Sequence, residues 1–375
     1  MSERLSNLVL LVRCYGRFLL HGRANAQVTN PRCVVIVQFG KLGDMVCTTP
    51  VFRAIKQKFP QARVVVVGDR AGGSVLAGNA DVDRYIICGK QDVAKTLAAL
   101  REETPDAGLT AGPSMRGFAL LYLAGAHLVV APQVVGRKSS EGTFYKLVRM
   151  LGVLRPHRIG QYAPREYLNL LEPFGITTDD TTKHLAVATE AKERVENFLQ
   201  EKGLADARLI GIASSAGNKL KNWPAERLAA VADYCAQKYN ARVVVLGAPS
   251  DKPESDALIR SAKITPLDTT GLFSIEELKA LIAQLEVFIG VDTGPIYIAE
   301  ALGVPTIDIV GPMDENEQPP RGPRNLVVVP PFERTPELFI MSPGIYNETE
   351  ARRQAQSITV KQVTDAVDVL MARKS

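Results

Sequence analysis

Short runs of β-branched residues alternate with helical patterns along most of this chain. In its first part, strands are predicted at residues 33–37, 63–67, 85–87 and 126–130, and helices at 49–59, 92–101 and 165–174. Continuous apolar strands that alternate with helices are typical of a parallel sheet with both faces covered. The pattern therefore predicts an α/β domain over residues 31–180.

A polar stretch rich in threonine and aspartate follows Gly175, and we place the domain boundary at residue 180. The alternation then begins again, with strands predicted at 209–212, 242–246, 287–289 and 306–310 and helices at 224–238, 253–262, 274–284 and 295–302. Ser274 and Glu277 form a capping-box pattern at the start of one of these helices. A second α/β domain is expected over residues 181–355, followed by a final amphipathic helix within 356–375.

Residues 1–30 form a basic amphipathic extension. Arg4, Arg13, Arg17 and Arg23 interrupt an otherwise apolar segment, and the apolar run 8–12 is too short for a signal-peptide core or a membrane span. A basic amphipathic helix can lie on an anionic membrane surface, which is one interpretation. The other is a helix packed on the first domain, or a poorly ordered extension.

The composition narrows the class of protein. Hydrophobic residues make up 46% and charged residues 23%, the balance of a globular protein. The net charge of +5 suits an anionic substrate or membrane surface, but it is too diffuse to indicate nucleic acid as a partner. Five cysteines without CxxC spacing support neither a disulfide framework nor a zinc site, and they indicate a reducing compartment.

Ligands of open parallel sheets bind beyond the carboxyl ends of the strands, at helix N-termini, so the loops after strands are the places to search. The first such loop is residues 39–44, FGKLGD, where Gly40 and Gly43 allow a tight turn and close approach of a ligand. Asp44 is either chemically active or only a helix cap that binds backbone N–H groups. The G-x-x-G spacing is a poor match to the dinucleotide fingerprint G-x-G-x-x-G.

The second loop is Asp292-Thr293-Gly294-Pro295, between a predicted strand and a predicted helix. Pro295 suits the first helical turn, where Thr293 and Gly294 would present a hydroxyl and backbone N–H groups at the positive helix end. Two linked phosphates would fit such a site. Ordinary capping by Asp292 or Thr293 is the alternative.

The third loop, residues 214–224, combines Ser214, Ser215, Lys219 and Lys221. Hydroxyls and lysines in a loop of small residues can hold a phosphate by hydrogen bonds and charge. Trp223, the only tryptophan, is expected to anchor the next helix by packing.

These loops together resemble glycosyltransferase family 9, the heptosyltransferases. The segments that carry the resemblance are 36–52 (IVQFGKLGDMVCTTPVF), 79–84 (NADVDR), 221–224 (KNWP) and 289–312 (IGVDTGPIYIAEALGVPTIDIVGP). The resemblance extends over nearly all of the chain after residue 32. It implies a GT-B fold, with two facing Rossmann-like domains and parallel sheets, the acceptor on the first domain and the nucleotide sugar on the second. It also implies a final helix that packs back on the first domain.

The resemblance assigns the two expected catalytic residues. Asp44, next to Gly43, would be the general base, and Lys221 would stabilise the leaving diphosphate. The hydroxyls of Ser214 and Ser215 would help Lys221 to hold the diphosphate, and Lys219 is the second lysine of the same loop.

The resemblance also implies a set of nucleotide-binding residues. Thr293 and Gly294 would contact the diphosphate from the other side. Asp292 would lie beside the nucleotide, and Asp251 and Phe273 near the adenosine. In addition, Tyr297 stands where the family carries a histidine, so a neutral hydroxyl replaces a cationic contact to phosphate.

These expectations describe a cytoplasmic, inverting glycosyltransferase without metal or other cofactor. It would move a heptose or a similar sugar from an ADP-sugar donor to a lipid-linked or glycan acceptor of lipopolysaccharide type, with or without peripheral contact with the inner membrane. Asp81 and Asp83 form a D-x-D pattern, but in a segment that the family uses structurally. A catalytically silent GT-B binding protein is one alternative, and an NAD-dependent oxidoreductase, which lacks its glycine fingerprint here, is the other.

Overall fold

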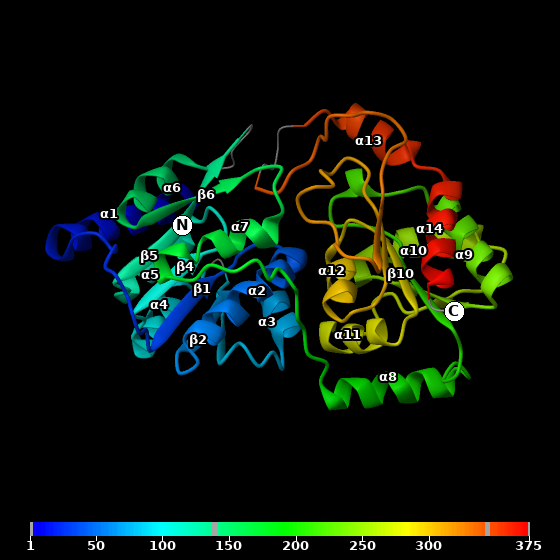
Figure 1. The fold of residues 1–375 in the computed structure, drawn as a ribbon, viewed down its shortest axis with the longest axis horizontal. Helices are drawn as coiled ribbons and strands as arrows, with labels where there is room; N and C mark the ends of the chain where they lie inside the picture. Colours follow the sequence, from blue (N-terminus) through cyan, green and yellow to red (C-terminus); the bar gives the residue numbers. More distant parts are fainter. Residues whose placement is uncertain (1–2, 90, 137–140, 342–345, 374–375) are drawn as a thin grey trace. The chain divides into compact units, whose positions relative to one another are not determined.

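The computed structural model describes residues 3–89, 91–136, 141–341 and 346–373. The chain forms two compact α/β units, one of residues 1–184 with 340–343 and the other of residues 185–339 with 344–375 (Figure 1). The first unit extends to His184 because this residue is bound there. Its backbone N–H donates to Thr49 Oγ1 at 3.1 Å, and its carbonyl accepts from Asn79 Nδ2 at 3.1 Å.

The first unit contains a parallel six-stranded sheet in the order β3-β2-β1-β4-β5-β6. Its strands are β1 Cys33–Val37, β2 Arg63–Gly68, β3 Arg84–Ile87, β4 Ala107–Thr110, β5 Leu128–Val135 and β6 Val153–Arg158. The strand order reverses direction between β1 and β4, and ligands of Rossmann-like sheets bind at such a switch point. The loop of residues 39–44 begins directly at this point.

Helices cover the first sheet. They are α1 Glu3–His21, α2 Leu42–Lys58, α3 Arg70–Leu76, α4 Val93–Glu103, α5 Met115–Ala124, α6 Thr143–Val148 and α7 Ala163–Asn169, with short 3-10 turns η1 Arg149–Leu151 and η2 Glu172–Phe174. One side of α1 enters the core through Leu10 and Cys14, and this helix packs on α5 and α6. Residues 3–21 of the extension therefore form a helix that packs on the first unit through one of its sides. Whether this helix also contacts a membrane stays a prediction.

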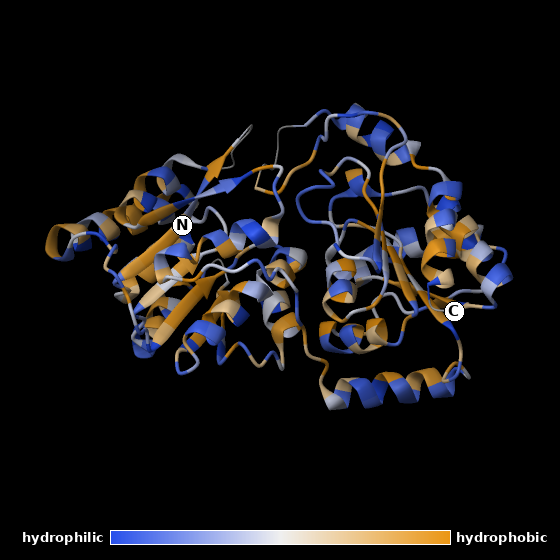
Figure 2. Cartoon of the chain, viewed as in Figure 1, coloured by the Kyte–Doolittle hydropathy of each residue, from blue (hydrophilic) through white to orange (hydrophobic). Residues whose placement is uncertain are grey.

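The second unit repeats the topology, with a sheet in the order β12-β11-β10-β7-β8-β9. Its strands are β7 Leu209–Ala213, β8 Arg242–Leu246, β9 Leu267–Asp268, β10 Val287–Val291, β11 Thr306–Ile309 and β12 Asn325–Val328. The switch point lies between β7 and β10. Hydrophobic residues run along the strands of both sheets, as expected for parallel sheets covered on both faces (Figure 2).

The helices of the second unit are α8 Thr189–Glu201, α9 Ala225–Tyr239, α10 Lys252–Ser261, α11 Ile275–Ala283, α12 Gly294–Ala301, α13 Glu348–Ser357 and α14 Val360–Ala372, with 3-10 turns η3 Lys219–Lys221 and η4 Pro249–Asp251. At the start of α11, Ser274 N–H donates to Glu277 Oε2 at 2.8 Å and Ser274 Oγ accepts from Glu277 N–H at 3.3 Å. The predicted capping box is confirmed.

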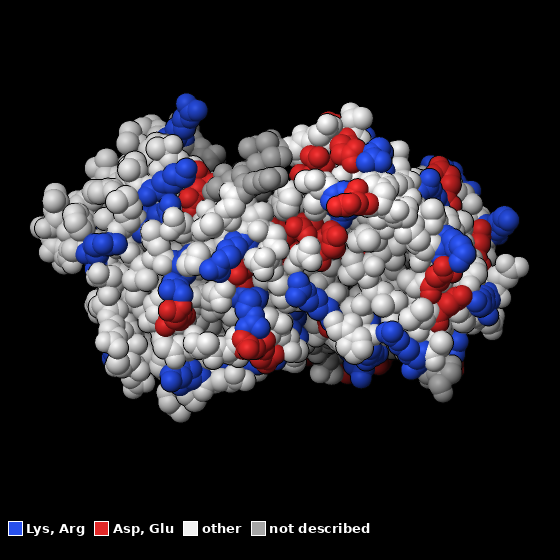
Figure 3. Space-filling view, turned by 45° about the horizontal axis from the view of Figure 1, so that its top comes forward, with Lys and Arg blue, Asp and Glu red and all other residues white. Residues whose placement is uncertain are grey.

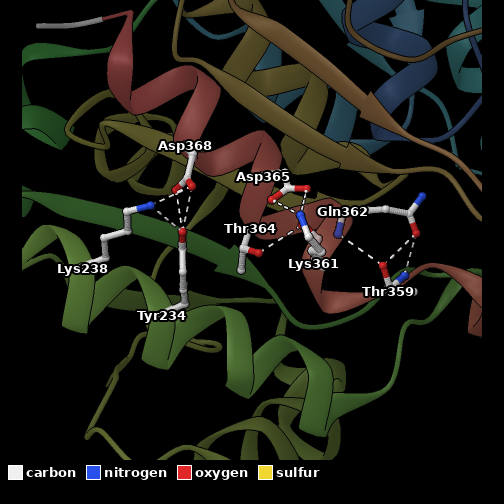
Figure 4. A network of polar contacts seen from close by, with 8 residues as sticks. All are labelled: Tyr234, Lys238, Thr359, Lys361, Gln362, Thr364, Asp365 and Asp368. Carbon is white, nitrogen blue, oxygen red and sulfur yellow. Dashed lines mark hydrogen bonds and ion pairs between the residues drawn. The ribbon is translucent and has the colours of Figure 1, made fainter.

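The final helix, α14, packs on the second unit. Its buried side joins the core formed by β7, β8, β10 and β11. Outside this core, the Asp368 carboxylate accepts hydrogen bonds from Tyr234 at 2.8 Å and Lys238 at 2.7 Å of α9 (Figure 4). It also accepts one from Tyr239, at the end of the same helix, at 2.6 Å. The apolar side of α14 and its carboxylate thus both make contacts within the second unit, and the expectation that the last helix packs back on the first domain stays a prediction.

Two smaller predictions can also be compared with the structure. Trp223 is 3% exposed and its Nε1–H donates to the carbonyl of Ile358 at 3.0 Å, which confirms it as a packing anchor. Basic and acidic side chains are mixed over the face that Figure 3 draws. On that face, the net positive charge is not gathered into one patch.

Candidate active site

The loop after β1 is built around a buried glutamine. Gln38 is 2% exposed, its Oε1 accepts from the backbone N–H of Gly40 at 2.9 Å, and its Nε2 donates to Thr48 Oγ1 at 2.9 Å. The side-chain amide thus ties the turn to the first helical turns of α2. A buried polar group with both ends bonded fixes the loop conformation.

Asp44 lies over this turn and depends on Gly40. A Cβ atom on Gly40 would lie 2.6 Å from both Cβ and Oδ2 of Asp44, so only glycine leaves room for the carboxylate. Asp44 Oδ2 accepts from the N–H of Lys41, the N-cap residue of α2, at 2.8 Å. Asp44 is therefore the third residue of the helix and not its N-cap, but its half-buried carboxylate does bind the helix start.

Arg116 is a residue of this edge that the sequence reasoning missed. It lies in the first turn of α5, after β4, on the other side of the switch point. Its guanidinium lies over the ring of Phe39, 4.0 Å from the centroid, and donates to the carbonyl of Gly89 at 3.2 Å. With exposed Lys41, it makes the edge beside Asp44 basic, which favours an anionic ligand.

An ion pair joins the two sides of the second switch point. Lys221 follows β7, Asp292 follows β10, and Lys221 Nζ lies 2.5 Å from Asp292 Oδ2 and 3.2 Å from the Asp292 carbonyl. Both side chains are largely withdrawn from solvent, with 18% of the lysine and 2% of the aspartate exposed. The structure thus brings together two predicted residues that are 71 positions apart in the chain.

Tyr297 completes this cluster from the first turns of α12. It is 2% exposed, and its hydroxyl donates to Asp292 Oδ1, the oxygen opposite the one that Lys221 binds. The residue that departs from the family pattern therefore holds Asp292 in place. Its hydroxyl supplies a hydrogen bond where a histidine would add a titratable charge.

Asp308 is a second buried carboxyl that the sequence reasoning missed. It is 0% exposed on β11, where it aligns with Gly290 of β10, and among the described residues neither carboxyl oxygen has a hydrogen-bond partner. Burial, and then the negative charge of Asp292, raise the pKa of Asp308 well above its ordinary value. Both causes favour the neutral form of the Asp308 carboxyl.

The start of α12 matches the predicted anion site in its residue order. Thr293 is the N-cap residue, Gly294 begins the helix and Pro295 lies in its first turn. The Thr293 hydroxyl makes no capping hydrogen bond, and the Asp292 carboxylate binds Lys221 and Tyr297. Neither side chain caps the helix, so ordinary capping does not account for this loop.

The two serines of the loop after β7 are buried and hydrogen-bonded. Ser214 Oγ lies 2.9 Å from Ser255 Oγ, and Ser215 Oγ donates to Asp251 Oδ1 at 2.6 Å. Asp251 also accepts from the backbone N–H of Ala248 at 2.9 Å. These bonds connect the loops after β7 and β8 at their carboxyl ends.

The two lysines of the same loop differ in environment. Lys219 is 50% exposed and pairs with Glu254 at 2.7 Å and with Asp251 at 3.8 Å. Lys221, at 18% exposure, reaches the switch point through Asp292. Of the two, Lys221 is therefore positioned for a ligand of the crevice, and Lys219 supports the acidic side chains beside it.

Phe273 precedes α11 and is half-buried. Its ring packs edge-to-face against Phe198 of α8, with the centroids 5.1 Å apart. The contact that the structure records for this side chain is thus with a helix of its own unit.

Comparison with known proteins relates these features to one family. The sequence model of glycosyltransferase family 9 (heptosyltransferase) matches residues 97–343, a range that includes Lys221 and Asp292 and begins after Asp44. Lipopolysaccharide heptosyltransferase 3 of Escherichia coli K12 is 25% identical over an alignment of 283 residues, which covers 72% of this chain and 80% of that protein.

Solved structures of similar proteins share the fold. The glycosyl transferase family 9 structure from Veillonella parvula DSM 2008 has a TM-score of 0.76 at 22% identity, over 93% of this chain and 99% of that one. The E. coli heptosyltransferase WaaC with ADP-2-deoxy-2-fluoro heptose has a TM-score of 0.61 at 18% identity, over 90% and 99%. Together with the two parallel sheets, these similarities confirm the predicted fold class.

Asp308 gives a prediction for stability against pH. Because its pKa is raised, this carboxyl keeps its proton to a higher pH in the folded protein than in the unfolded chain, where the ordinary pKa is about 3.9. The free energy of unfolding should therefore fall as pH rises above about 4, by up to about 1.4 kcal/mol per pH unit from this group alone. Asp308→Asn cannot titrate, so it should gain stability relative to wild type as pH rises.

Chemical denaturation of both proteins between about pH 4 and pH 8 measures this difference. A gap that grows with pH agrees with a neutral, buried Asp308. A variant that is less stable than wild type at pH 7, with no change in the pH profile, would show that the carboxylate is charged.

Proposed function

Because this chain belongs to glycosyltransferase family 9, the heptosyltransferases, we propose that it transfers a heptose or a similar sugar from an ADP-sugar to a lipopolysaccharide-type glycan. The observation that carries this proposal is the Lys221–Asp292 pair at the switch point of the second sheet, where sheets of this topology bind nucleotides. It is supported by similarity to lipopolysaccharide heptosyltransferase 3 and to WaaC, whose structure contains an ADP-heptose analogue.

The donor diphosphate is proposed to bind between Lys221 and the start of α12. Thr293 and Gly294 there offer a hydroxyl and a backbone N–H at the positive end of the helix dipole. The pair with Asp292 holds Lys221 at this position before the ligand arrives. As the ADP leaves, its growing negative charge strengthens its interaction with Lys221, which is how such a group lowers the barrier.

The remaining predicted residues are assigned to the nucleotide. The Ser214 and Ser215 hydroxyls would assist with the phosphates, and Asp251, with Lys219 beside it, would lie near the adenosine. Phe273 would contact the base with the part of its ring that Phe198 does not cover.

The acceptor is proposed to bind at the first switch point, beside Asp44. In a single displacement, Asp44 takes the proton of an acceptor hydroxyl while that oxygen attacks the anomeric carbon and the bond to ADP breaks. The sugar configuration is thereby inverted. Arg116 and Lys41 make this edge basic, which suits an acceptor that carries acidic groups.

We place the reaction in the cytoplasm, in peripheral contact with the inner membrane that would hold a lipid-linked acceptor. Five buried cysteines, with no disulfide among the described residues, fit a reducing compartment. A catalytically silent binding protein is the alternative to transfer. It would be favoured if the folded protein bound ADP-heptose and neither transferred nor hydrolysed it.

The proposed mechanism needs no metal ion, because Lys221 and backbone N–H groups stabilise the leaving diphosphate. The two D-x-D carboxylates bind other groups of the chain. Asp83 pairs with Lys56 at 2.6 Å and accepts from the Val64 N–H at 2.6 Å, and Asp81 pairs with Arg53 at 3.9 Å. Turnover should survive excess EDTA in a transfer assay. Loss of turnover that Mg²⁺ or Mn²⁺ restores would contradict this part of the mechanism.

Lys221→Ala should lower turnover and raise the apparent donor constant. The two effects together should correspond to a loss of about 2–4 kcal/mol of transition-state stabilisation. Lys219→Ala is the matched control, because it removes a lysine of the same loop that pairs with other carboxylates. Turnover of the control at saturating donor should stay within about threefold of wild type, because Lys219 is paired away from the leaving diphosphate. Steady-state kinetics beside melting curves separates lost catalysis from lost stability. A large defect in the Lys219 variant with normal kinetics in the Lys221 variant would show that Lys219, and not Lys221, stabilises the leaving diphosphate.

Asp44→Asn tests the general base. Asparagine keeps the size and can still accept from the Lys41 N–H, so stability and donor binding should persist within a few fold. Turnover should fall by roughly 10²–10⁴, the usual contribution of a positioned base. The assay is the transfer rate at saturating donor. A folded variant with near-normal turnover would leave Asp44 only its structural role at the helix start.

A further inference from the structure

Helix α1 presents an apolar side to solvent. Of the fourteen large hydrophobic side chains that are exposed among the described residues, six lie on this one helix. They are Leu5, Leu8, Val9, Val12, Leu19 and Leu20, with exposed fractions from 43% to 82%, and we call them the α1 face. Two residues, Leu19 at 82% and Leu20 at 80%, have almost no cover from the rest of the protein.

The opposite side of the same helix is already buried. Leu10 and Cys14, which lie one helical turn apart, belong to the core of the first unit. Leu5, Val12 and Leu19 are spaced by seven residues and so follow one line along the other side, which makes the α1 face roughly 20 Å long. A helix with apolar residues on two opposite sides is expected to be covered on both, but the described chain covers only the side of Leu10 and Cys14.

The apolar surface continues onto the neighbouring segment. Leu147 at the end of α6 is 40% exposed, Met150 in η1 is 58% exposed, and the carbonyl of Leu147 accepts from Tyr15 of α1 at 3.1 Å. Eight of the fourteen exposed hydrophobic side chains therefore lie on α1 and the segment beside it. Such a concentration marks an interaction surface, whereas single exposed residues are ordinary.

The charges beside the α1 face select the kind of partner. Residues 4–43 contain no aspartate or glutamate, and the arginines at positions 4, 13 and 23 are exposed. An apolar strip beside arginines matches a helix that lies in the interface of an anionic bilayer. Two copies of the chain packed through this face would bring like charges together, which disfavours self-association.

We propose that the α1 face docks the protein on an anionic lipid surface, with its leucines and valines at the boundary of headgroups and acyl chains and its arginines against lipid phosphates. None of the described helices has the length and apolar content needed to span a bilayer, so the contact is peripheral. The purpose of this docking, access to a lipid-linked acceptor, rests on the proposed function. The docking itself rests only on the properties of α1.

Co-sedimentation of the full chain with vesicles tests the proposal. Vesicles of phosphatidylcholine with phosphatidylglycerol should bind the protein, and vesicles of phosphatidylcholine alone should bind it more weakly. Leu19→Ser with Leu20→Ser should lower binding at least about tenfold, since two exposed leucines no longer enter the bilayer. Leu272→Ser with Val369→Ser, two exposed sites of the second unit at 55% and 42%, is the matched control and should bind normally.

Arg13→Gln measures the electrostatic part. It should weaken binding to the anionic vesicles by about fivefold and leave binding to neutral vesicles unchanged. Wild-type protein that does not bind anionic vesicles, or a Leu19/Leu20 variant that binds them as well as wild type, would overturn the proposal. So would a lipid-free wild-type dimer, seen by light scattering, that the Leu19/Leu20 variant abolishes, because the α1 face would then be an interface between copies.

Transfer to a soluble acceptor glycan keeps this test separate from the proposed function. The Leu19/Leu20 variant should transfer sugar to such an acceptor at the wild-type rate. Vesicle binding without any transfer by the wild-type protein would contradict the proposed function and leave the docking surface standing.

Discussion

A buried ion pair between Lys221 and Asp292 is the interaction on which the candidate site depends. The two residues come from the loops after β7 and β10, and their 2.5 Å contact joins these loops at the switch point of the second sheet. Withdrawing two charges from water is costly, so the pair persists only because its geometry is good and further hydrogen bonds complete it. Tyr297 supplies such a bond to the second oxygen of Asp292. Asp308 is buried nearby, and burial together with the charge of Asp292 raises its pKa and so favours its neutral form beside the pair.

The topology of the chain explains why the chemistry gathers at these loops. Both sheets reverse their strand order once, between β1 and β4 in the first unit and between β7 and β10 in the second. At each reversal, the loops of two adjacent strands open in opposite directions and leave room for a ligand. Asp44 occupies one of these places and Lys221 with Asp292 the other. The proposed function needs one place for an acceptor and one for a nucleotide sugar, and the two reversals of strand order supply two candidates.

Much of the fold could be predicted because its strands are β-branched and continuous. The strands β1 and β8 coincide with predicted ones, whereas β4, with the residues Ala-Gly-Leu-Thr, and β6, with a proline and two arginines, lack that signal.

The loops of the candidate site, which follow strands, could be found from their residue types. The pairing of Lys221 with Asp292 could not, since nothing local connects positions 71 residues apart. Asp308 is hidden within an apolar strand. The contact of α14 with α9 depends on partners of Asp368 that lie about 130 positions earlier in the chain, so no local pattern reveals it.

The central claim is that the donor diphosphate binds at the second switch point, against Lys221 and the start of α12. A crystal structure of the protein with bound ADP tests it most directly. We expect the phosphates within hydrogen-bond distance of Lys221 Nζ and of the Gly294 backbone N–H, with Asp292 still bound to Tyr297. ADP whose phosphates lie away from both groups, while Lys221 keeps its contact with Asp292 alone, would contradict the account.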